Sequence, residues 1–139
     1  MADLERFVSA QAPVYGQVLA ELSAGRKQTH WMWFVFPQLR GLGRSGMAQH
    51  YGLAGLAEAR AYLGHPVLGS RLVACSALVL AAPHTPAEAI FGPIDALKLR
   101  SCMTLFERAA SAEPVFAQVL ERHCGGQRDP QTLAMLAGR

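Results

Sequence analysis

Proline and glycine interrupt this chain so often that its helices can only be short. Between the interruptions, apolar residues recur at three- and four-residue spacing, as at Val14, Val18 and Leu22, which is typical of one buried helix face. Strands are not expected, because sustained apolar–polar alternation and Asn-Gly or Asp-Gly turns are missing. The predicted helices cover residues 3–10, 13–25, 30–36, 56–63, 86–91, 93–110, 114–123 and 130–136, with a short turn over 45–51 and a longer helix that opens at Pro66.

Helices this short and this frequently broken favour an irregular all-α domain over an up-down bundle. The length of 139 residues suits one domain, and no linker-like composition divides it. With 51% hydrophobic and 17% charged residues the chain is not expected to be disordered. We predict a single compact all-helical domain over residues 1–139, with its short helices in an irregular superhelical arrangement.

Polar residues stand where several of these helices should begin. Asp3 and Thr29 are placed to cap the first and third predicted helices, and Ser45 to start the short turn. Residues Thr85 to Glu88 resemble a capping box with proline at the first helical position.

The sequence points to the cytoplasm and to no bound metal. The N-terminus lacks the basic and apolar regions of a signal peptide, and no apolar run is long enough to cross a membrane. Three cysteines occur without a CxxC pair, so we expect reduced, mostly buried thiols and no structural zinc. No metal-binding spacing occurs among the histidines either, so neither a catalytic metal nor another cofactor is predicted; they are His30, His50, His65, His84 and His123.

Charge is distributed unevenly along the chain. The formal net charge is only +3, but no Asp or Glu occurs between Glu21 and Glu58. That gap contains the cations Arg26, Lys27, Arg40 and Arg44, together with His30 and His50. One part of the surface should therefore have a positive potential and favour anionic partners.

The first candidate site is the aromatic segment at residues 25–38, which contains both tryptophans. A short helix that is aromatic nearly all round is typical of a buried core element. Arg26, Lys27 and His30 lie at its start, where an anion could bind while Trp31 or Trp33 stacks on a ring. Both interpretations, core helix and ligand site, follow from the same residues.

The second candidate is the glycine-rich stretch at residues 41–46. Its flexible backbone N–H groups and Arg44 suit an anion-binding nest. It has neither a Walker ending nor a preceding strand, so an ordinary turn between helices is the alternative.

The third candidate lies at residues 95–104. Lys98 is near Ser101 and Cys102 on a predicted helix, which in principle allows a nucleophile and its base. The alternative is an ion pair between Asp95 and Lys98, with the other polar residues connecting this helix to its neighbours.

Several long runs resemble one family of small bacterial proteins, the domain-of-unknown-function family 1810. They are GRKQTHWMWFVFPQ at 25–38, YLGHPVLGSRL at 62–72, IFG at 90–92 and KLRSCMTLF at 98–106. The resemblance covers nearly the whole chain and implies an all-α fold of short helices. It implies no activity, so no catalytic residue is carried over.

Members of that family are sometimes labelled calpastatin, a label that does not suit this sequence. A calpastatin-type inhibitor is a long, polar, disordered chain that folds on its target. This chain is short and apolar.

Two functions follow as hypotheses. The first is binding of a small anionic or nucleotide-like ligand, with Arg26, Lys27, His30, Arg44, Lys98 and Ser101 as polar contacts and Trp31 or Trp33 for stacking. The second is a non-catalytic protein-interaction module. Nucleic-acid binding is the weakest option because four cations are few. The sequence specifies no reaction.

Overall fold

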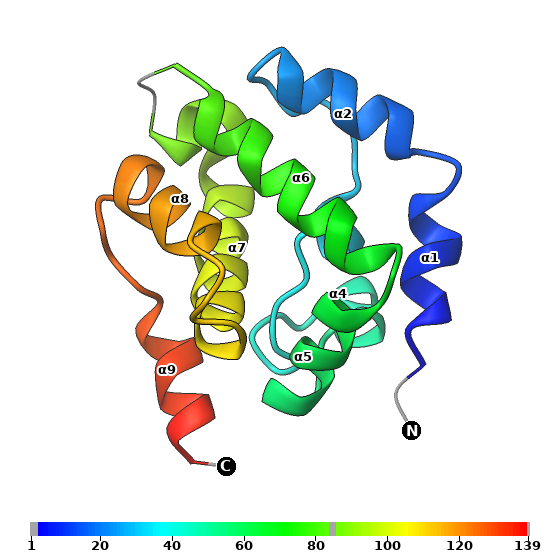
Figure 1. Ribbon diagram of the computed structural model, residues 1–139, viewed down its shortest axis with the longest axis vertical. Coiled ribbons are helices and arrows are strands. Elements are labelled where there is room, and N and C mark those ends of the chain that lie inside the picture. Colours follow the sequence, from blue (N-terminus) through cyan, green and yellow to red (C-terminus); the bar gives the residue numbers. More distant parts are fainter. Residues whose placement is uncertain (1–2, 84–85, 139) are drawn as a thin grey trace.

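Two long helices, α6 and α7, form the centre of the fold. In the computed structural model, which describes residues 3–83 and 86–138, α6 crosses between α1 and α2 on one side and α7 and α8 on the other (Figure 1). The helices of the described residues are α1 Glu5–Gln11, α2 Tyr15–Ser23, α3 Met32–Val35, α4 Gly46–His50, α5 Leu56–Gly64, α6 Leu68–Ala81, α7 Ala87–Ala109, α8 Val115–His123 and α9 Pro130–Ala137. The prediction of an all-α fold of short helices is confirmed, and the described residues contain one isolated β-bridge and no strand.

Helix α7 is broken where the sequence predicts a boundary. Gly92 adopts φ 81°, a backbone conformation that residues with a side chain rarely accept, and Pro93 follows it. The segment at 87–91 and the helix at 93–109 therefore have different directions. Ile90, which accepts from the backbone of Lys27, lies before this break, and the α7 residues that line the candidate site below lie after it.

Two of the predicted caps are wrong. Leu4 precedes α1 and makes no side-chain capping bond, so Asp3 is not the cap. Helix α3 begins at Met32, and the Thr29 hydroxyl instead donates to the carboxylate of Glu21, 2.6 Å away. The Ser45 prediction is confirmed, because its hydroxyl accepts from the backbone N–H of Ala48 at 3.0 Å. The predictions for His84 and Thr85 lie outside the described residues.

Most aromatic side chains of the segment at residues 25–38 lie in the core, whereas Arg26, Gln28, Thr29 and His30 at its start are exposed. Trp31 is 1% exposed and packs 6.2 Å from Phe36, which in turn meets Phe91 edge-to-face at 5.9 Å. Trp33 is the exception, because it is only partly buried. Burial of large aromatic surfaces makes this segment a major contributor to stability.

No helix of the described residues is both long and apolar enough to cross a membrane alone. Helices α5 and α6 have the length and composition only as a pair, and the pair is bent by 91° at its break.

Candidate functional site

A buried carboxylate holds the start of the aromatic segment. Glu21 of α2 is 4% exposed and accepts from the backbone N–H groups of Gln28 and Thr29 at 2.7 and 3.0 Å. It also accepts from the Thr29 hydroxyl, from the Gln17 amide at 2.9 Å and from the Trp31 indole at 3.0 Å. Burial alone would raise the pKa of Glu21, but hydrogen bonds led by those from Thr29 and Gln28 outweigh it and lower the pKa to about 2. Glu21 is therefore ionised and fully engaged as a structural anchor.

A second carboxylate brings together two of the predicted lysines. Lys27 Nζ lies 2.8 Å from Asp95 Oδ2, and Lys98 Nζ lies 3.5 Å from Asp95 Oδ1. Each ammonium group also lies 5.0 Å from an indole ring, Lys27 over Trp31 and Lys98 over Trp33. Two cations share one carboxylate, so this cluster has a formal charge of +1.

The backbone explains why these residues meet. The N–H of Lys27 donates to the carbonyl of Ile90 at 2.8 Å, which ties the aromatic segment to the first part of α7. Asp95 and Lys98 then follow one helical turn apart beyond the break at Gly92. The expected i,i+3 ion pair is present, with a second lysine added to it.

A hollow of about 420 Å³ opens beside this cluster, and we call it the α7 hollow. It lies between the second part of α7, the loop at 38–43 and the first turn of α9, and its walls are Gln38, Leu42, Gly43, Ile94, Leu97, Lys98, Arg100, Ser101, Asp129, Pro130 and Gln131. A smaller crevice that includes Trp33 and Tyr51 shares Gln38 and Lys98 with it. All three candidate segments from the sequence thus reach the same region.

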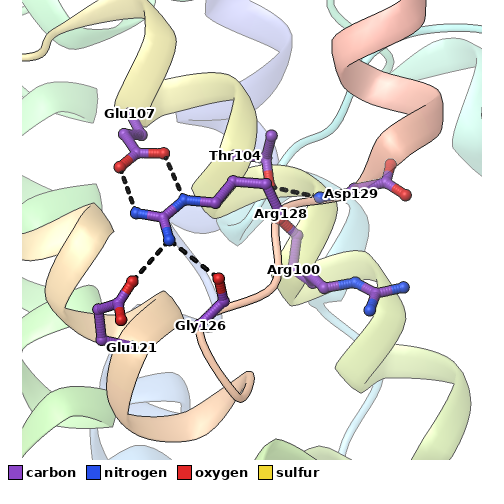
Figure 2. A network of polar contacts seen from close by, with 7 residues as sticks. All are labelled: Arg100, Thr104, Glu107, Glu121, Gly126, Arg128 and Asp129. Carbon is purple, nitrogen blue, oxygen red and sulfur yellow. Dashed lines mark hydrogen bonds and ion pairs between the residues drawn. The ribbon is translucent and has the colours of Figure 1, made fainter.

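Asp129 lines the α7 hollow and connects two of its walls. This residue caps α9, accepting from the Thr132 N–H at 3.1 Å and the Thr132 hydroxyl at 2.5 Å, while Ser101 Oγ lies 3.0 Å from the same oxygen. Its own N–H donates to the hydroxyl oxygen of Thr104 at 3.0 Å, as Figure 2 shows. Ser101 therefore connects α7 to α9. Because the ammonium group of Lys98 contacts Asp95 and the Trp33 ring, Ser101 and Lys98 do not form a nucleophile–base pair here.

Arg128 fixes the loop that carries Asp129. Its guanidinium makes two bonds to Glu107, at 3.0 and 2.6 Å, one to Glu121 at 2.6 Å and one to the carbonyl of Gly126 at 3.0 Å (Figure 2). Hydrogen bonding from Arg128 lowers the pKa of Glu107 below its usual range. This network joins α7, α8 and the start of α9, so it makes the wall of the hollow rigid.

Arg100 points the other way. Its guanidinium extends away from the Arg128 network (Figure 2), and the residue lines both the α7 hollow and a neighbouring hollow that contains Gln127 and Glu88. Its Nη1 lies 3.5 Å from the amide oxygen of Gln127, a neutral partner. Its Nε is buried and has no hydrogen bond within the described residues. Arg100 therefore adds a positive charge that no carboxylate neutralises among the described residues.

The remaining predicted site residues lie elsewhere. Arg26, His30 and Arg44 are exposed and form no part of the walls of the α7 hollow. The Trp31 ring is enclosed by the core and by Lys27, so it offers no face for a ligand.

The three thiols are buried or partly buried, and the described residues contain no group placed to bind a metal ion. Burial raises the pKa of Cys75 and of Cys124 to about 11 and that of Cys102 well above its usual range, so all three are neutral thiols near pH 7. Within residues 3–83 and 86–138, no cluster of three His, Cys, Asp or Glu side chains is placed to hold a metal ion.

Three residues of the site were not predicted from the sequence. Glu21 had a signal, because it lies three residues after Val18 and beside Leu22 on the apolar face of its helix. Asp129 had another, since it precedes Pro130 at a helix start. Arg100 had none, because its role depends on which loops pack beside α7.

Comparison with known proteins identifies the family and a close structural relative. No curated protein matches the chain. A solved structure titled as the conserved hypothetical protein Rv1873 from Mycobacterium tuberculosis is 56% identical, with a TM-score of 0.96 over 97% of this chain and 96% of that one. Residues 1–136 match the family described as Protein of unknown function (DUF1810), and the chain belongs to that family.

Proposed function

We propose that the α7 hollow binds a small organic anion with an apolar portion, for which nucleotides and phosphorylated metabolites are the first class to test. The observation that supports this most directly is the meeting of Lys98 and Arg100 with two exposed apolar side chains around one hollow. At about 420 Å³, the hollow is within the range of small-molecule sites.

The charges around the hollow favour an anion. Asp95 is shared between Lys27 and Lys98, so it neutralises only one of them. The carboxylate of Asp129 accepts hydrogen bonds from Ser101 and from the Thr132 N–H at the start of α9. Lys98 and Arg100 therefore leave an excess of positive charge where Gln38 and Gln131 supply further polar contacts.

The apolar side of the hollow favours a ligand that is more than a simple ion. Ile94 is 70% exposed and Leu97 is 58% exposed, an unusual state for large apolar residues that lie one turn apart. A ligand that covered them would gain roughly 25 cal/mol for each Å² of apolar surface removed from water.

A thermal-shift screen of nucleotides and phosphorylated metabolites, followed by calorimetry of the best compound, tests the proposal. We expect Lys98→Gln to weaken binding at least tenfold, because it removes the charge at the centre of the site. Arg44→Gln is the matched control, since it removes an exposed cation outside the hollow. No shift at millimolar ligand, or equal binding by the two variants, would contradict the proposal.

The same exposed residues support a second candidate, a protein-interaction module. Pro93, Ile94 and Leu97 form an exposed apolar ridge on α7. A photo-crosslinker at position 97 distinguishes the two. A discrete protein adduct that persists in Lys98→Gln and is not displaced by any screened compound favours the module over the anion site.

A further inference from the structure

A second cleft, larger than the α7 hollow, lies apart from it. Its volume is about 1040 Å³, and it shares no lining residue with the hollow. One part of its lining is polar, with Arg6, Arg40 and His50, while Leu56, Ala61 and Leu136 make another part apolar. We call it the α5 cleft.

Two guanidinium groups converge in the α5 cleft on one carbonyl oxygen. Arg6 Nη2 lies 3.3 Å and Arg40 Nη2 lies 3.0 Å from the carbonyl oxygen of Gly52. Two positive charges therefore lie close together at one neutral acceptor, where an anionic group could contact both.

Two acidic residues, Asp3 and Glu58, also line the cleft, and among the described residues only Glu58 of the two forms an ion pair, with Arg6. Glu58 lies 3.7 Å from Arg6 Nη2, and the same oxygen accepts the Ala54 N–H at 2.8 Å. Arg6 also donates to the carbonyl of Asp3, on the N-terminal side. Arg40 has no carboxylate partner in the described part of the chain, and its side chain donates to the carbonyls of Gln49 and Gly52.

The backbone holds Arg40 firmly in this place. The N–H of Arg40 donates to the Leu53 carbonyl at 2.8 Å, and the N–H of Leu53 donates to the Gln38 carbonyl at 2.9 Å, which forms the isolated bridge. A Cβ atom at Gly52 would lie 2.6 Å from the Cα of Arg40, so only glycine allows this approach. An arginine without an ion-pair partner is thus held by a specific arrangement of two loops, and within residues 3–83 and 86–138 its Nη1 makes no hydrogen bond.

From this geometry we infer that the α5 cleft is a second binding site, for an organic anion whose carboxylate or phosphate is held by Arg40 and whose apolar part lies against α5 and Leu136. A planar guanidinium suits either group, because both present two oxygens at the spacing of its N–H donors. This site does not depend on the α7 hollow, and it can be present whether or not the hollow binds a ligand.

Calorimetric titration of phenyl phosphate and of benzoate into Lys98→Gln protein isolates this cleft, because that background lacks the central charge of the α7 hollow. We expect at least one probe to bind at millimolar concentration, and the preferred probe identifies the anionic group. Adding Arg40→Gln should weaken binding at least tenfold, whereas adding Arg44→Gln should leave it within about twofold.

Ala61→Glu provides a variant that removes no hydrogen bond. Residue 61 is exposed on α5 and lines the cleft, so a glutamate there adds bulk and negative charge without disturbing Arg40. It should weaken binding as Arg40→Gln does. Absence of binding by both probes, or equal binding by the Ala61→Glu and Arg44→Gln proteins, would overturn the inference.

Discussion

Two carboxylates hold the aromatic segment, and they do so in opposite ways. Glu21 is buried and accepts only from neutral groups that the fold fixes in place, whereas Asp95 is more exposed and is shared by two lysines. At Glu21 the donors converge on the carboxylate and leave no room for another group. At Asp95 a positive charge is left over beside an open hollow. The comparison teaches that two carboxylates at the start of the same aromatic segment can differ in role, one belonging to the scaffold and the other bordering a candidate site.

The largest effect on stability is expected when Glu21 is substituted. Glu21→Gln removes the charge and places amide hydrogens against the N–H groups of Gln28 and Thr29, so we expect a loss of about 3 kcal/mol in the free energy of unfolding. Urea denaturation measures it. Glu5→Gln on the exposed face of α1 is the control and should change stability by less than about 0.5 kcal/mol. Similar values for the two variants would show that Glu21 is not an anchor.

The pH dependence of stability tests the same residue without changing its shape. The pKa of Glu21 falls from 4.5 to about 2 on folding, so its contribution is present above pH 4.5 and is lost as the pH falls toward 2. That contribution is on the order of 2 to 3 kcal/mol. Between pH 4.5 and pH 2, the free energy of unfolding from urea denaturation should fall less steeply for Glu21→Gln than for the natural protein. An equal pH dependence of the two proteins would contradict the assignment.

A smaller effect on stability is expected at Arg128. Its guanidinium belongs to a charged network in which every hydrogen bond goes to another group of the fold. Arg128→Lys keeps the charge but loses the paired bonds to Glu107, so we expect a loss of about 1 to 2 kcal/mol. Hydrogen exchange should show faster opening of α9 than of α6, because Arg128 fixes the loop before α9. Uniform destabilisation of both helices would mean that the network does not act locally.

The smallest effect on stability is expected at Lys98. Its side chain is 22% exposed and lies 3.5 Å from Asp95, whereas Lys27 is 7% exposed and lies at 2.8 Å. Lys98→Gln should therefore cost less than about 1 kcal/mol, and Lys27→Gln should cost more. Chemical denaturation of both variants measures the difference, and the reverse order would place the structural lysine on α7 instead.

The helices were predictable from sequence because their signals are local. Proline at 66, 93, 114 and 130 and glycine at 64 and 92 mark boundaries that the structure keeps within a few residues. Thr29 shows where local reasoning fails: its hydroxyl was available for a cap, but the carboxylate of Glu21 in the preceding helix is a stronger acceptor.

The candidate site was only partly predictable for the same reason. Lys27 and Asp95 are far apart in the sequence, so their ion pair depends on how the aromatic segment packs against α7. Trp31 and Trp33 are two residues apart in one short segment, and sequence alone could not tell which of them is buried completely. Charge statistics drew attention to residues 22–57, but they could not separate Arg40 from Arg44, because the difference lies in the backbone contacts that hold Arg40.

Helix α9 has a place in both proposed sites. Pro130 and Gln131 at its start line the α7 hollow, and Leu136 near its end lines the α5 cleft. A helix of eight residues is about 12 Å long, so one rigid rod reaches from one wall to the other. Any displacement of α9 changes both walls together, and a ligand that shifts it from one side alters the affinity of the other side by a reciprocal factor. Helix α9 would in this way couple the two proposed sites, while Arg128 holds the loop before its first turn in place.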